Sequence, residues 1–198
     1  MKKVWYIVLL TWAIVLVVYG VMEANDKKHM VNEEENPSVE VSGTLNEGSN
    51  SLLVTMINTK GETVGEAKLE QTNKGVNIQL NASNLTPGVH GFHIHENGVC
   101  EAPSFESAGG HFNPTGAKHG FDHPEGPHAG DLPNIEVKQD GTVSTNVLAE
   151  MVTLEKGKDN SLLKEGGTSL MIHSKADDYK SQPAGDSGER IACGVIAE

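Results

Sequence analysis

From Ser38 onward the sequence predicts an all-β domain, built as an antiparallel sandwich or barrel. Short stretches alternate apolar and polar residues, turn residues separate them at intervals of about 8 to 12 residues, and no stretch has convincing helical periodicity. Alternation with period two places one face of each strand against a core. Short, regularly spaced strands without helices are typical of antiparallel sandwiches and barrels.

The predicted strands all fit a half-buried, pleated surface. Turn signals lie between them, for example at Lys60-Gly61, Asn73-Lys74-Gly75, Pro87-Gly88 and Asp140-Gly141. The strands are predicted at Val39–Ser42, Leu53–Ile57, Ala67–Glu70, Val76–Leu80 and Ile135–Lys138.

Two long segments rich in Gly and Pro interrupt this pattern. We call Cys100–Asp131 the first loop and Ser174–Gly188 the second loop. A long loop without secondary structure is unusual in a compact domain unless it is functional or is held by something other than a core. The first loop carries four His and ends at Asp131, so we expect a metal ion to hold it.

The N-terminal segment, residues 1–22, is predicted to be a membrane anchor or a signal peptide. Lys2 and Lys3 precede an almost unbroken apolar run from Val4 to Met22, which would span roughly 28 Å as a helix. Candidate cleavage sites are poor, which favours an uncleaved anchor over a cleaved signal peptide. Either way we expect the domain to be exported and extracytoplasmic, anchored at the cell surface or secreted.

The remaining segments are an acidic polar tether, residues 23–37, and the domain itself, residues 38–198. The tether has too few apolar groups to offset its ordering entropy. The chain has 27 acidic and 15 basic side chains, a net charge of −12. Residues 1–37 hold five of those acids and four of the bases, so the domain keeps a charge of −11. This charge excludes nucleic acid as its main partner.

The only two cysteines, Cys100 and Cys193, are first interpreted as a disulfide because the domain is predicted to be exported. The alternative is a pair of buried thiols. A bond between them would close a loop of about ninety residues, for which chain entropy gives about 4 to 5 kcal/mol.

Seven of the nine His lie between His90 and His128. His93 and His95 are two residues apart in a predicted strand, so both imidazoles share one face while Phe92 and Ile94 point to the other. Two adjacent imidazoles can bind a metal ion, although such a pair is also common without one. Three His and a carboxylate, as in a structural zinc site, follow in the first loop: His111, His119, His128 and Asp131.

Six segments, spread over essentially all of residues 38–198, together resemble the copper/zinc superoxide dismutases in their bacterial form. The resemblance implies a Greek-key β-sandwich or barrel in which the first loop is the zinc and disulfide loop and the second is the electrostatic loop. The segments are Gly91–Glu96, Ser107–Pro114, Lys118–Gly120, His128–Leu132, His173 with Ala176–Asp178, and Gly188–Ile196.

The resemblance implies a role for each candidate site residue, and every ligand position of the family pattern is occupied. Asp177 would hydrogen-bond one ligand from each metal site, His93 and His119. Copper would be held by His93, His95, His111 and His173, and zinc by His111, His119, His128 and Asp131, with His111 bridging the two ions.

The implied reaction converts superoxide to O2 and hydrogen peroxide as copper alternates between Cu(II) and Cu(I). His111 would carry a proton during the cycle, and zinc would be structural. The single arginine, Arg190, would contact the superoxide anion, since a guanidinium stays charged and offers planar donors.

Two other functions are compatible with parts of the sequence. A non-enzymatic surface protein that binds copper or zinc on the same scaffold would not require Arg190 or an open copper position. A structural adhesion-type β-domain would explain the strands but not the spacing of the His residues and Asp131. The sequence does not indicate whether the domain is a monomer or a dimer.

Overall fold

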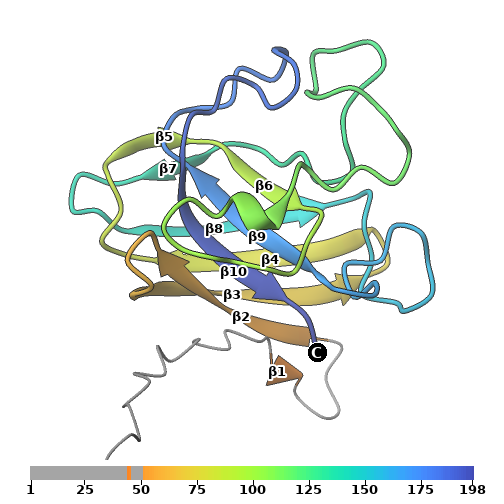
Figure 1. The fold of residues 1–198 in the computed structure, drawn as a ribbon, viewed down its shortest axis with the longest axis horizontal. Helices are drawn as coiled ribbons and strands as arrows, with labels where there is room; N and C mark the ends of the chain where they lie inside the picture. The colour runs from red at the N-terminus through yellow and green to blue at the C-terminus, as the bar shows by residue number, and fades with distance from the viewer. Residues whose placement is uncertain (1–43, 46–50) are drawn as a thin grey trace, which may run out of the picture. The chain divides into compact units, whose positions relative to one another are not determined.

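The computed structural model describes residues 44–45 and 51–198, all within the unit Val39–Glu198 of the chain (Figure 1). The predicted anchor, the tether and the predicted strand Val39–Ser42 lie outside the described residues. In the part of the chain that is described, no helix is long and apolar enough to cross a membrane.

Nearly all regular structure in the described residues is β-strand, as predicted. One short 3-10 helix, η1 (Glu106–Ala108), interrupts the first loop. The strands are β1 (Thr44–Leu45), β2 (Ser51–Asn58), β3 (Thr63–Thr72), β4 (Gly75–Ala82), β5 (Gly88–His90), β6 (Phe92–His95), β7 (Ile135–Val137), β8 (Val143–Ala149), β9 (Thr168–His173) and β10 (Arg190–Ile196).

The strands form one large curled antiparallel sheet in the order β6-β9-β10-β2-β3-β4-β8, with β1 beside β2 and with β5 and β7 as a separate pair (Figure 1). Neighbours in the sheet are often distant in sequence, so long connections must cross between them. Two of them, which contain the first and second loops, follow β6 and β9 at one edge of the sheet. The predicted all-β, barrel-like fold is confirmed.

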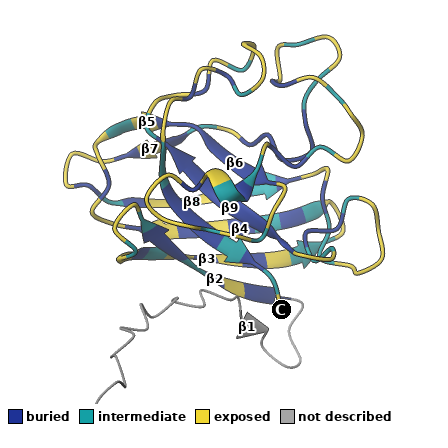
Figure 2. Ribbon diagram, viewed as in Figure 1, coloured by how far each residue is buried: buried dark blue, intermediate teal, exposed yellow. Residues whose placement is uncertain are grey.

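The strands differ in how many of their faces are covered (Figure 2). β3 and β4 alternate between buried and exposed residues, because one face packs on the core and the other meets solvent. Every residue of β6 and β9 is buried instead. Their inner face joins the main core, which includes Phe92, Ile94, Leu170 and Ile172, and their outer face is covered by the loops.

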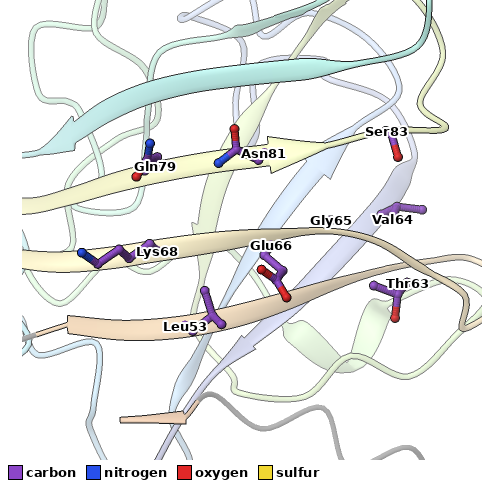
Figure 3. Close-up of a pocket in the computed structure, with 9 residues that line it drawn as sticks. All are labelled: Leu53, Thr63, Val64, Gly65, Glu66, Lys68, Gln79, Asn81 and Ser83. Carbon is purple, nitrogen blue, oxygen red and sulfur yellow. The ribbon is translucent and has the colours of Figure 1, made fainter. Parts of the chain in front are cut away.

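The exposed face of β2, β3 and β4 contains an open hollow of about 440 Å³ (Figure 3). Its lining is mainly polar and includes Glu66, Lys68, Gln79 and Asn81. No histidine or cysteine lines it, so it contains none of the candidate site residues.

A disulfide between Cys100 and Cys193 fastens the start of the first loop to the middle of β10, with a Cα–Cα distance of 5.8 Å. The disulfide interpretation is therefore confirmed over two free thiols. Around it lies a small second core formed by Ile57, Phe105, Ala108, Met171 and Cys193. With so little apolar surface of its own, the first loop depends on this bond and on the polar contacts described below.

Replacing both cysteines by alanine should lower the free energy of unfolding by about 2 to 5 kcal/mol, because the unfolded chain loses the constraint of a closed loop. Alanine avoids placing a hydroxyl at Cys193, which is fully buried. Denaturant titration of the full chain in mild detergent measures the loss, and reduction of the unsubstituted protein should reproduce it. An unchanged unfolding midpoint would show that the bond does not stabilise the domain.

Candidate metal centre

Strand pairing brings the first three candidate ligands together. On β6, Phe92 and Ile94 point into the core, so His93 and His95 share the opposite face, as the two-residue spacing predicted. β9 pairs with β6 and ends at His173, directly after Ile172, the partner of Phe92. The third imidazole therefore lies at the end of β9, beside His93 and His95.

The first loop folds back onto β6 and supplies the fourth imidazole. His111 forms an isolated bridge with His95, and the backbone N–H of Phe112 donates to the carbonyl of Ile94 at 2.8 Å. The ligand atoms of all four rings lie within 4.8 Å of one another. We call this group the four-histidine cluster: His93, His95, His111 and His173.

The four-histidine cluster has the properties of a metal site. His93 Nδ1 and His111 Nε2 are buried without any hydrogen-bond partner, which is rare for polar atoms unless they have another ligand. Burial and the neighbouring imidazoles lower the pKa of His111 to about 4 and that of His173 to about 3. Burial likewise lowers the pKa of His95 well below its usual value. Neutral imidazoles with free nitrogen atoms are suited to bind a metal ion.

A second group shares His111 and adds three residues of the first loop. Asp131 Oδ1 lies 2.7 Å from His111 Nδ1, 3.1 Å from His119 Nδ1 and 3.2 Å from His128 Nδ1. The last contact lacks hydrogen-bond geometry, so His128 Nδ1 has no hydrogen-bond partner. We call this group, His111, His119, His128 and Asp131, the His₃Asp cluster; its ligand atoms also lie within 4.8 Å of one another.

Backbone donors orient the carboxylate of Asp131. Its Oδ2 accepts hydrogen bonds from the N–H groups of Gly120 and His128 at 2.8 and 2.9 Å, which leaves Oδ1 facing the three imidazoles. Burial alone would raise the pKa of Asp131, but hydrogen bonds from the imidazoles and from Gly120 hold it well below the usual range. An ionised carboxylate and three imidazoles make a complete tetrahedral zinc ligand set.

Asp177 connects the two clusters from the second loop. Its Oδ2 lies 2.8 Å from His93 Nε2, and its Oδ1 lies 3.0 Å from His119 Nε2. Burial would raise the pKa of Asp177, but these contacts and the backbone N–H of Tyr179 lower it. Each ring donates its Nε2–H to the carboxylate and therefore turns Nδ1 toward its own cluster. The predicted role of Asp177 thus agrees with its position.

His119 lies between two carboxylates, and its pKa reflects both. Burial by itself would lower the pKa of His119, but hydrogen bonds to Asp131 and Asp177 raise it to about 9. A metal ion bound at Nδ1 must displace the proton from that atom, so binding to the His₃Asp cluster competes with protons.

Two side-chain amides that the sequence did not single out hold these residues in place. Asn134 accepts from the backbone N–H of Asp177 and donates to its carbonyl, both at 2.9 Å. Gln182, in the second loop, accepts from the N–H of His119 at 3.0 Å and donates to its carbonyl at 2.9 Å. Gln182 therefore joins the second loop to the first loop, and Asn134 joins the second loop to the segment that directly follows the first loop.

His90, which had no predicted role, is buried behind the four-histidine cluster. Its two ring nitrogens lie 2.7 Å from the carbonyl oxygens of His173 and Thr86. It thereby fixes the backbone of His173. His123 belongs to neither cluster, and its Nδ1 accepts from the N–H of Glu125.

Arg190 lies at the edge of the four-histidine cluster. Its guanidinium donates to the carbonyls of Phe105 and Gly109 at 2.5 and 2.6 Å. The Gly109 oxygen is also 3.0 Å from His95 Nδ1, so one carbonyl separates Arg190 from a candidate copper ligand. Burial lowers the pKa of Arg190 and Glu106 raises it. The guanidinium nevertheless stays charged at any physiological pH.

Comparison with known proteins identifies the same family that the sequence resembles. The family model for copper/zinc superoxide dismutase (SODC) matches residues 63–196. Superoxide dismutase (Cu-Zn) 2 of Aquifex aeolicus is 61% identical over 142 residues, which cover 71% of this chain and 83% of the relative. The superoxide dismutase-like protein YojM of Bacillus subtilis is 46% identical, over 72% of this chain and 74% of the relative.

Solved structures show the same fold. A double mutant of a SOD-like protein from Bacillus subtilis superposes with a TM-score of 0.72 at 46% identity, over 74% of this chain and 97% of that one. The Cu/Zn superoxide dismutase from Brucella abortus gives a TM-score of 0.61 at 35% identity, over 74% and 99%. Sequence, fold and the paired clusters agree that this chain belongs to the copper/zinc superoxide dismutase family.

Proposed function

We propose that the chain is an extracytoplasmic superoxide dismutase in which the four-histidine cluster holds copper and the His₃Asp cluster holds zinc. One observation carries this assignment: His111 belongs to both clusters, with Nδ1 in the His₃Asp cluster and a buried, unpartnered Nε2 in the four-histidine cluster. His111 is therefore the residue that would contribute to both metal sites.

The chemistry of the ligands supports one metal for each cluster. Four imidazoles suit copper, and the adjacent Arg190 offers donors to an anion. Three imidazoles and a carboxylate close a tetrahedral shell, which suits a structural zinc ion that does no redox work.

Copper would supply the redox chemistry, taking one electron from a superoxide to release O2 and passing it to a second superoxide, which takes up two protons to become hydrogen peroxide. The protein positions the anion through the unused N–H groups of Arg190, whose plane is fixed by the carbonyls of Phe105 and Gly109. Nε2 of His111 faces the four-histidine cluster without a hydrogen-bond partner, so it would hold a proton during the cycle when it does not hold copper. Asp177 keeps the rings of His93 and His119 in the tautomer that directs Nδ1 inward.

Substituting His173 by alanine should abolish dismutation and leave zinc binding intact, because His173 belongs only to the four-histidine cluster. Superoxide consumption and the metal content of the purified full chain measure the two effects. The reciprocal substitution His128→Ala should reduce zinc content first. Unchanged activity in His173→Ala would show that the copper ligand set is wrong, and a metal-filled wild type without activity would favour a metal-binding protein.

Substituting Asp177 by asparagine should weaken zinc binding by about 10- to 100-fold, the usual effect of losing a group that orients a metal ligand. The neighbouring Asp178→Asn variant is the matched control, because Asp178 is exposed and its carboxylate bonds only Lys180 and Ser181 of its own turn. Chelator competition measures the zinc affinity. Equal affinities in the two variants would exclude an orienting role for Asp177.

The proposed location outside the cytoplasm is supported by the apolar run Val4–Met22 and by the disulfide, a bond that persists in oxidising compartments. We expect residues 1–22 to remain as a membrane anchor. Activity should then sediment with membranes, and mass spectrometry should find the N-terminal segment intact. A shortened N-terminus would instead establish a cleaved signal peptide and a secreted domain.

A further inference from the structure

A depression of about 500 Å³ opens beside Arg190, and we call it the vestibule. It lies where the first loop, the end of the second loop and the residue after β2 meet. Its lining residues are Thr59, Pro103, Ser104, Glu106, Gly188, Glu189 and Arg190.

The vestibule borders the four-histidine cluster. The carbonyl oxygen of Gly188 lies 3.3 Å from His173 Nδ1. Arg190 donates to the Gly109 carbonyl, which lies 3.0 Å from His95 Nδ1. Two buried nitrogen atoms of the same cluster, on His93 and His111, have no hydrogen-bond partner. An ion that approaches the cluster through this depression must pass its side chains.

Two carboxylates oppose the one guanidinium that lines the vestibule. Glu106 and Glu189 are both exposed, and Glu106 acts on Arg190 through its charge. Within residues 51–198, neither glutamate lies within 4.0 Å of a cationic group, and no carboxylate lies that close to Arg190. The stem of Lys175 packs beside Gly188, but Lys175 does not line the depression. The lining residues therefore carry an excess of negative charge.

We infer that Glu106 and Glu189 make the vestibule selective by charge, so that they slow the approach of superoxide and speed the uptake of the copper cation. This inference rests on the proposed copper site and on superoxide as the substrate. A carboxylate about 8 Å from an anion repels that anion weakly in screened solvent. Two such carboxylates lower the local anion concentration roughly two- to fourfold. The effect on a divalent cation has the opposite sign and is larger, about fourfold or more.

The test compares two double variants of the full chain that lose the same total charge. Glu106→Gln/Glu189→Gln removes the carboxylates of the vestibule. Glu66→Gln/Glu150→Gln is the matched control, since Glu66 lies on the outer face of β3 and Glu150 follows β8, beside the start of β4 at the far end of the sheet. The rate of superoxide consumption is measured at low salt and near 1 M salt. Copper uptake by zinc-loaded, copper-free protein is followed by the visible absorption of Cu(II).

The vestibule variant should consume superoxide about two- to fourfold faster at low salt, lose this advantage at high salt and take up copper more slowly than the control. Arg190→Ala should change the superoxide rate in the opposite direction. Equal rates in the two double variants, for both superoxide and copper, would overturn the inference. A copper-loaded wild type that consumes no superoxide would overturn the proposed function instead, and copper uptake would still test the vestibule.

Discussion

The buried carboxylate of Asp177 is the interaction on which the arrangement of both loops depends. It lies out of water between His93 on β6 and His119 in the first loop, although it belongs to the second loop. Burying an ionised carboxylate costs several kcal/mol unless hydrogen bonds replace its solvation. Two imidazole N–H groups and the backbone N–H of Tyr179 supply those bonds only when all three segments are in place. The same constraint therefore positions one candidate ligand in each cluster and holds the two loops against the sheet.

The sequence predicts the candidate ligands better than it predicts the residues that hold these ligands in place. His93 and His95 could be assigned to one face because a strand alternates, and the complete ligand set followed from a family resemblance. The residues that hold the candidate ligands each do so with one side chain that hydrogen-bonds a backbone group distant in sequence. No periodicity or spacing in the sequence indicates them. They are Asn134, Gln182 and His90. Among the strands, β8 alternates in burial although it is absent from the predicted strands, whereas β9 is buried on both faces and therefore lacks the alternation that indicates a strand.

A negatively charged domain can act on a negatively charged substrate only because the effect of each charge is local. At physiological salt the field of distant carboxylates is screened within about 8 Å, so the charges beside the cluster dominate the last part of an anion's approach. Arg190 is oriented by two neutral carbonyls rather than by a carboxylate. Carbonyls fix the guanidinium plane without neutralising it, which leaves its positive charge available to an anion.

A β-bulge in β10 explains how Arg190 reaches this position. Ala192 pairs with Ile172 and points into the core, yet Arg190 pairs with His173, so two steps along β10 correspond to one step along β9. In a regular ladder Ile191 would lie opposite His173, and Arg190 would share the core-facing side with Ala192. The extra residue reverses this alternation and turns the guanidinium toward the first loop and the histidines. A one-residue irregularity at the end of a strand thus decides whether the only arginine of the chain is available to the four-histidine cluster.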